Sequence, residues 1–195
     1  FFSQDFNAST VVTDYANDLN PTSGMFNALT TTAATSPPVT VSITNGALRF
    51  NRTAIGTIFA YRNFAFDVKP NFVQLKMDFE ASGNVVGTQT PVFNVFVGSA
   101  FSSASTGMAS AYASRFGIVA EATPGDFRIS TVDNIGGAPL TAVFSGKQTL
   151  TFVVNNSGVD QTYTAPNGST ETVGNGKMDV WIGQTKGIND FSLKF

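Results

Sequence analysis

The sequence has 195 residues, a net charge of −2 and only 12% charged residues, and it contains neither histidine nor cysteine. Its few Lys and Arg residues stand singly, so we expect no nucleic-acid partner. The lack of His and Cys excludes Ser–His and Cys–His nucleophilic pairs and the usual zinc ligands. No apolar run reaches the length of about 18 residues that a membrane-spanning helix needs, so we expect no membrane insertion.

The N-terminal stretch FFSQDF alternates phenylalanines with polar residues over residues 1–6. Alternation with a period of two is typical of a strand with one buried face, so this stretch predicts an N-terminal strand. Residues 14–38 are rich in Thr, Ala and Pro and show no such period. They predict a long surface connection, a kind of segment that often carries function.

A β-hairpin is predicted at residues 39–50, VTVSITNGALRF. Two alternating apolar runs flank the pair Asn45-Gly46. This pair is typical of a type I′ turn, because both central residues of that turn need a positive φ.

The clearest single strand is FVQLKMDFE, residues 72–80, whose alternation places four apolar side chains on one face: Val73, Leu75, Met77 and Phe79. A second strand is predicted in VFNVFVG, residues 92–98. The small-residue segment 98–114 then predicts a second long surface connection.

The second half of the sequence predicts strand after strand. These are RFGIVAE at 115–121, DFRISTV at 126–132, QTLTFVVNN at 148–156, QTYTAPNGSTETV at 161–173 and KMDVWIG at 177–183. Within 161–173, the stretch Pro166-Asn167-Gly168-Ser169 predicts a tight hairpin turn.

The sequence ends in DFSLKF, residues 190–195, which also alternates. We expect Phe191, Leu193 and Phe195 to be buried on one face of a terminal strand. This strand is predicted to pair with the N-terminal strand at 1–6 or to lie beside it.

Many short strands, with turn signals roughly every 8 to 12 residues, predict an all-β fold with very little helix. The chain contains 19 Phe, four Tyr and one Trp. Phe has no polar tip and usually fills the space between sheets. We therefore expect a single domain over 1–195, built as a two-sheet antiparallel β-sandwich of jelly-roll topology.

One strand holds a candidate ligand site. In KMDVWIG, alternation places Lys177, Asp179 and Trp181 on the face opposite the apolar residues. An aromatic ring beside a carboxylate and an ammonium group suits a sugar, so these three residues are the candidate ligand-binding residues. The alternative is that Trp181 is buried, under a loop or in the core, with its indole N–H satisfied.

The two terminal strands raise the question of a metal. If they are neighbours, Asp5 and Asp190 could approach each other at one sheet edge and hold a structural calcium ion. Calcium needs six to eight oxygen ligands, so two carboxylates are weak support. The alternative is that each Asp stabilises a turn or cap. No cofactor is required.

A carboxylate pair on one strand face is the only feature that suggests catalysis. Asp78 and Glu80 are two residues apart, as the pair of a glycosidase could be. The sequence around them, KMDFEASG, lacks the Glu-x-Asp-x-x-Glu pattern of laminarinase-like jelly-roll enzymes. A solvated strand face explains the pair better, and we expect the protein not to be an enzyme.

The segment FSGKQTLTFVVNNSG…YTAPNGSTETVGNGKMDVWIGQTK, within residues 144–186, and the opening FSQDFNAST…DY resemble a known module. This module recurs in large secreted or cell-surface proteins of gliding bacteria that use type IX secretion. The resemblance implies a concanavalin- or laminin-G-like jelly roll that is secreted, extracellular or at the cell surface. It implies no catalytic residues.

The sequence leaves two functional classes open, and a third is a remote alternative. The first is a non-enzymatic extracellular module that acts in adhesion or glycan binding, with a glycan or another surface ligand as partner. The second is a self-assembling structural subunit of a filament, sheath or matrix, which would polymerise through its terminal strands; its low charge and strand edges favour this class. A glycan-active enzyme is the remote third.

Overall fold

A computed structural model of the chain describes residues 2–32, 39–51, 57–63, 70–83, 92–98, 112–131 and 141–193. These residues form strands joined by turns, with one 3₁₀ helix, η1 (Val12–Tyr15), and no α-helix among them. Every strand pair in the described part of the chain is antiparallel. The predicted all-β class is therefore confirmed. Most of the connection predicted at 98–114 lies outside the described residues.

The described residues divide into two compact units. Unit 1 contains the described part of residues 2–63, and unit 2 contains the described part of residues 70–193. Each unit has its own strands and its own buried side chains. The single-domain organisation expected over 1–195 stays a prediction.

Unit 1 consists of η1 and two antiparallel strand pairs. One pair is β1 (Ala28–Thr32) with β4 (Thr57–Tyr61), and the other is β2 (Thr40–Thr44) with β3 (Ala47–Asn51). The turn between β2 and β3 has Asn45 at φ 53° and Gly46 at φ 68°. Positive φ at both central residues is the type I′ geometry that the Asn-Gly pair predicts, so this hairpin is confirmed.

The strand predicted at residues 1–6 is wrong for the residues that the structure describes, since 2–10 form bends and irregular backbone. Phe6 has a φ of 56°, which breaks the alternation of a strand. The backbone N–H of Phe6 donates to Oε1 of Gln4, and the N–H of Asn7 donates to Oδ1 of Asp5. These local side-chain bonds satisfy the backbone in place of a neighbouring strand.

The segment expected as a long connection, 14–38, contains a strand that the sequence analysis missed. β1 runs within it and pairs along its whole length with β4. An isolated bridge between Ala16 and Phe26 also folds the segment back on itself. Thr is a good strand residue, but this Thr-rich stretch has no apolar alternation that would predict a strand.

Unit 2 contains two four-stranded antiparallel sheets and a two-stranded hairpin. Sheet I has the order β14 (Thr185–Ser192), β13 (Lys177–Ile182), β10 (Gln148–Asn155), β5 (Phe72–Phe79). Sheet II has the order β6 (Phe93–Gly98), β7 (Tyr112–Ala120), β8 (Asp126–Ser130), β9 (Phe144–Ser145). The hairpin is β11 (Gln161–Thr164) with β12 (Thr170–Val173).

One buried cluster joins the facing sides of sheets I and II. Phe116 of β7 meets Phe152 of β10 edge to face, with 5.1 Å between ring centroids, and Phe79 of β5 meets Phe127 of β8 at 5.3 Å. Burying one such side chain contributes about 1.5–3 kcal/mol. The inward face predicted for 72–80 is confirmed at Leu75, Met77 and Phe79, which pack on this cluster. Unit 2 is therefore β-sandwich-like in character.

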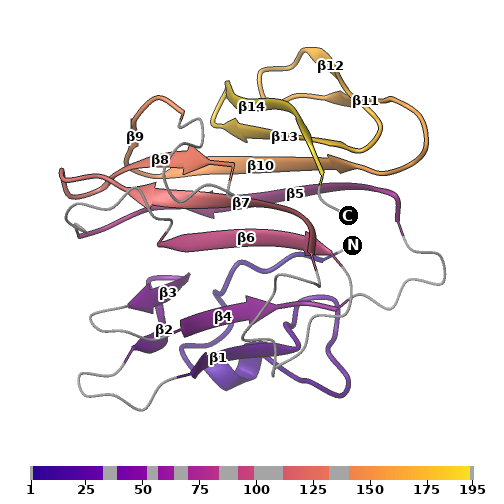
Figure 1. The fold of residues 1–195 in the computed structure, drawn as a ribbon. Helices are drawn as coiled ribbons and strands as arrows, with labels where there is room; N and C mark the ends of the chain where they lie inside the picture. The colour runs from indigo at the N-terminus through magenta and orange to yellow at the C-terminus, as the bar shows by residue number, and fades with distance from the viewer. Residues whose placement is uncertain are drawn as a thin grey trace. The chain divides into compact units, whose positions relative to one another are not determined.

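The hairpin β11–β12 covers the other face of sheet I, as Figure 1 shows above β13 and β10. A second buried cluster lies beneath it: Val153, Tyr163, Ala165, Val173 and Trp181. The turn of this hairpin is the predicted one, with Gly168 at φ 85° and the N–H of Ala165 bonded to the carbonyl of Ser169. Sheet I is thus covered on both faces over part of its area.

The C-terminal strand is confirmed as far as Ser192, where β14 ends, but its burial differs from the prediction. Leu193 is buried, Phe191 is 37% exposed, and Phe195 lies outside the described residues. Two irregularities break the period of two: the register between β13 and β14 shifts on either side of Val180, and Asp190 has a φ of 49°. β14 is also the last strand of sheet I, so no described strand covers Phe191.

Candidate functional site

Asp179 on β13 is the only charged residue among the buried residues that the structure describes, and its exposed fraction is 0%. Met178, Val180 and Ile182 point into the core between the sheets, as the alternation predicts. Asp179 therefore points to the opposite face, beneath the hairpin β11–β12. A buried carboxylate is costly unless hydrogen bonds and charges compensate it, so its partners decide what this place can do.

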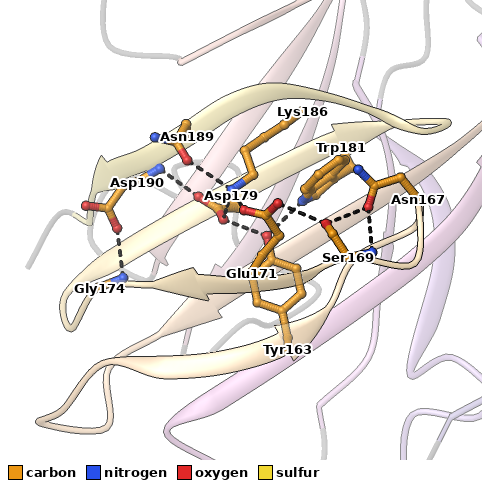
Figure 2. A network of polar contacts seen from close by, with 10 residues as sticks. All are labelled: Tyr163, Asn167, Ser169, Glu171, Gly174, Asp179, Trp181, Lys186, Asn189 and Asp190. Atoms are coloured by element: carbon orange, nitrogen blue, oxygen red, sulfur yellow. Dashed lines mark hydrogen bonds and ion pairs between the residues drawn. The ribbon is translucent and has the colours of Figure 1, made fainter.

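Tyr163 of β11 connects Asp179 to the single tryptophan. The Tyr163 hydroxyl donates to Oδ2 of Asp179 at 2.6 Å and accepts from Nε1 of Trp181 at 2.8 Å. Figure 2 shows the Tyr163 hydroxyl reaching both the carboxylate and the indole, which come from the same strand, β13. Trp181 is only 2% exposed, and its one polar atom is satisfied inside the protein.

Lys186 of β14 brings the positive charge to this place. Its Nζ lies 2.8 Å from Oε2 of Glu171 and 3.1 Å from Oδ2 of Asp179. It also donates to Oδ1 of Asn189 at 3.0 Å and lies 5.2 Å from the centroid of the Trp181 ring, a cation–π distance. The Lys186 side chain is 17% exposed, so one ammonium group serves two carboxylates in a mostly buried position.

The backbone supplies the last contact. The N–H of Asp190 donates to Oδ1 of Asp179 at 2.6 Å. This N–H points at the carboxylate because Asp190 adopts a positive φ in the irregular part of β14. The Asp190 side chain turns away and accepts from the N–H of Gly174 at 2.8 Å (Figure 2). β-bulges commonly re-aim groups in this way.

Glu171 of β12 is held from its other side by the hairpin turn. Its Oε1 accepts from the hydroxyl of Ser169 at 2.9 Å, and that hydroxyl also lies 2.7 Å from Oδ1 of Asn167. We call the set Tyr163, Glu171, Asp179, Trp181, Lys186 and Asp190 the Asp179 network. It ties β11, β12, β13 and β14 to one another.

The pKa values of three network groups shift in directions that follow from these contacts. Burial, and then the hydrogen bond to Asp179, raises the pKa of Tyr163 well above its ordinary value. Burial lowers the pKa of Lys186, but the hydrogen bonds to Glu171 and Asp179 outweigh it, so the net shift is upward. The hydrogen bond from Lys186, followed by that from Ser169, lowers the pKa of Glu171.

The three residues predicted to bind a sugar are only partly together. Asp179 and Trp181 share a face and the Tyr163 hydroxyl, but both are buried beneath β11–β12. Lys177 instead donates to Oγ of Ser192 at 2.9 Å. The structure thus matches the alternative, a buried Trp181 with a satisfied indole N–H. A sugar would reach the ring only if the hairpin moved, and the ligand site stays a prediction.

The two aspartates proposed for calcium lie in different units, Asp5 in unit 1 and Asp190 in unit 2. Each makes the turn contact of the alternative interpretation: Asp5 accepts from the N–H of Asn7, and Asp190 from the N–H of Gly174. Among the described residues, no group of three or more His, Cys, Asp or Glu side chains is arranged to hold a metal ion. Structural calcium stays a prediction.

Asp78, of the carboxylate pair considered for catalysis, makes two contacts on the outer face of sheet I. Its carboxylate lies 2.9 Å from Nζ of Lys147 and accepts from Thr149 at 2.8 Å. The bond to Lys147, followed by that to Thr149, lowers its pKa. The Asp78 side chain is 55% exposed, which agrees with the solvated-face interpretation.

Sequence reasoning missed Tyr163, Glu171 and Lys186, although part of the signal was present. The predicted hairpin turn at 166–169 pairs Tyr163 directly with Glu171, and the turn after Ile182 pairs Trp181 with Lys186. Both pairs follow from the positions of the turns, because residues at equal distances on either side of a hairpin turn lie opposite each other. What the pattern does not contain is the docking of β11–β12 onto sheet I, which unites the two pairs.

Comparisons of the chain with protein-family models, with curated proteins and with solved structures found no match. The resemblance to modules of gliding bacteria therefore stays a prediction. Within the described ranges, no helical segment has the length and hydrophobicity of a transmembrane helix.

Proposed function

We propose that the chain is a non-enzymatic, secreted or cell-surface β-sandwich module that acts in adhesion by binding a glycan or another surface ligand. The observation that carries this proposal is the closure of the Asp179 network. Both oxygens of Asp179 accept bonds from the protein itself, and Glu171 is held by Lys186 and Ser169. Charges that are used in this way fasten a scaffold and are not presented to a substrate.

The jelly-roll topology and the two-sheet sandwich are part of the same proposal. The shared core of sheets I and II supports a two-sheet sandwich in unit 2. The chain passes from sheet I to sheet II between β5 and β6 and returns between β9 and β10. Such exchange between sheets is a property of jelly rolls, although β6 to β9 follow one another as a meander. The extracellular location rests on the sequence resemblance.

Features of the strand edges favour binding over self-assembly. β14, the terminal strand proposed to pair between copies, is irregular beside Val180, and β9 at one edge of sheet II has only two residues. Bulged and very short edge strands discourage pairing with another chain. The N-terminal partner strand of the assembly hypothesis is absent from residues 2–10.

Self-assembly stays the second candidate because of one observation at the other edge of sheet I. β5 pairs with β10 without a register shift over its eight residues, and it is the last described strand on that side. A regular edge of this length can accept a further strand. Lys76 and Asp78 on its exposed face act against such pairing.

The purified chain should be tested on a glycan array, in a polysaccharide-hydrolysis assay and by electron microscopy. Binding of the monomer to one glycan class, without release of sugar, supports the proposal. Release of sugar would contradict the non-enzymatic part. Regular polymers would favour the structural subunit, and the β5 variant Gln74→Pro should then stop polymer growth.

A further inference from the structure

Lys186 and Asp179 lie on neighbouring strands and share a position that excludes most water. Nζ of Lys186 is 3.1 Å from Oδ2 of Asp179, and the side chains that cover the pair, Trp181 and Tyr163, are buried. The carbon that the amine would attack, Cγ of Asp179, is one C–O bond away from this oxygen, and the near-attack separation for the reacting atoms is about 3–3.5 Å. An amine and a carboxyl group held in this way can condense to an amide.

The surroundings differ from those of an ordinary ion pair on a protein surface. A buried ion pair carries a desolvation penalty for both ions. Condensation converts the ammonium and the carboxylate into one neutral amide and therefore removes this penalty. The same burial limits the access of the water that would hydrolyse the product. The site thus favours the amide over the separated ions.

The Asp179 carboxylate is polarised from both sides. Its Oδ1 accepts from the backbone N–H of Asp190 at 2.6 Å, which would stabilise the negative charge that develops on that oxygen during attack at Cγ. Its Oδ2 accepts from the Tyr163 hydroxyl at 2.6 Å. The N–H donor is in place because of the positive φ of Asp190, a conformation that costs free energy and is often found at functional sites.

A base is needed because the ammonium form of Lys186 cannot attack. Oε2 of Glu171 lies 2.8 Å from Nζ, within reach for direct proton transfer. Glu171 is positioned by the Ser169 hydroxyl on its other oxygen. The four groups come from three strands that only the fold brings together: the amine and the oxyanion donor from β14, the carboxyl group from β13 and the base from β12.

We propose that Lys186 and Asp179 form an intramolecular isopeptide bond, with Glu171 as the proton-transfer residue. The Nζ–Cγ bond forms and the Cγ–Oδ2 bond breaks. Two of the three ammonium protons pass through Glu171 to Oδ2, which leaves as water. The reaction needs no oxidant, reductant or co-reactant. It happens once per molecule and links β13 to β14 covalently, whatever ligand the protein binds.

Asp179 is the acceptor, although Lys186 also touches Asn189 and Glu171. Asn189 lies on the same strand as Lys186 and is exposed, and only its Oδ1 contacts Nζ, at 3.0 Å. Glu171 is 30% exposed. Of these three side chains, Asp179 alone combines complete burial with a donor on each oxygen.

The test is the intact mass of the purified, denatured full chain together with a tryptic digest. We expect a deficit of one water molecule relative to the sequence mass. Trypsin should fail to cut after Lys186, and residues 178–194 should be recovered as one looped peptide that is short by one water molecule. In Lys186→Arg and in Glu171→Gln the full mass should return, while the control Lys177→Arg should keep the deficit. Circular dichroism confirms that each variant is folded.

A folded wild-type protein of full sequence mass would overturn the proposal. A deficit of one ammonia molecule, or a looped peptide that joins Lys186 to Asn189, would overturn the assignment to Asp179. A water deficit that persists in Lys186→Arg would show that the loss arises elsewhere. A deficit in Glu171→Gln equal to that of the wild type would overturn the role of Glu171. None of these results depends on whether a glycan binds.

Discussion

The Tyr163 hydroxyl and the Asp179 carboxylate are joined by a 2.6 Å hydrogen bond that connects the hairpin β11–β12 to sheet I. The bond lies at a buried place, so water cannot replace it. The hydroxyl also accepts from Trp181, which makes it the common partner of the ring and the carboxylate.

Removal of this hydroxyl in Tyr163→Phe should lower the free energy of unfolding by about 1–3 kcal/mol, because the buried indole N–H loses its acceptor. Urea unfolding followed by far-UV circular dichroism measures the change. Thr162→Ala, an exposed neighbour on the same strand, is the matched control and should change stability little. Equal effects of both variants would show that the hydroxyl does not fasten the hairpin.

Trp181→Ala should lower the free energy of unfolding by about 3–5 kcal/mol, the range for removing a large buried side chain. Trp181→Phe keeps most of the ring and should cost clearly less. Differential scanning calorimetry compares the two. If Trp181 were instead an exposed sugar platform, the Ala variant would lose glycan binding and keep its melting temperature, which is the opposite pattern.

Alkaline pH should destabilise the protein through Tyr163. Burial raises the pKa of Tyr163 in the folded state above its ordinary value of 10.0. Below pH 10.0 the hydroxyl is protonated in both states, so its contribution is fully present there; above it, the unfolded chain ionises first and stability falls. Unfolding in urea at a series of pH values should show a steeper fall for the wild type than for Tyr163→Phe. Parallel curves would contradict the shift.

Lys147→Ala should raise the pKa of Asp78 towards its ordinary value of 3.8, because the bond from Lys147 is the main cause that lowers it. NMR titration of the Asp78 carboxyl measures this change. The pair is exposed, so stability should hardly change. Lys76→Ala on the same strand is the control. A pKa that stays low in Lys147→Ala would assign the shift to Thr149 instead.

Gly46→Ala should destabilise unit 1 more than Gly146→Ala destabilises unit 2. The two glycines have nearly the same φ, 68° and 65°, so the cost of placing an L-residue there, about 1–2 kcal/mol, is shared. At Gly46 the added Cβ would clash with Oδ1 of Asn7, whereas at Gly146 nothing lies within 4 Å. Hydrogen exchange of each unit gives the two costs. Equal costs would mean that Asn7 moves aside freely.

The sequence predicts those parts of the fold that depend on local rules. The hairpin at Asn45-Gly46 follows from turn chemistry, and the inward face of β5 follows from strict alternation. β1 was missed because its Thr-rich sequence has no alternation, and its strand conformation comes from pairing with β4. A partner strand distant in the sequence leaves no local pattern.

The candidate site shows the same limit. Alternation correctly places Asp179 and Trp181 on one face, and turn counting recovers their cross-strand neighbours. The positive φ of Asp190 and the docking of the hairpin depend on tertiary contacts. The sequence of the terminal strand at 190–195 therefore predicts a regular alternation, which the positive φ of Asp190 interrupts.

The burial of Trp181 gives the molecule a built-in optical probe. It is the only tryptophan of the chain, and it lies in unit 2, against Tyr163 and within cation–π distance of Lys186. Its fluorescence therefore reports the attachment of β11–β12 specifically, since unit 1 has tyrosines at positions 15 and 61 but no indole. A red shift of this emission that precedes the loss of circular dichroism would record the release of the hairpin before the sheets separate.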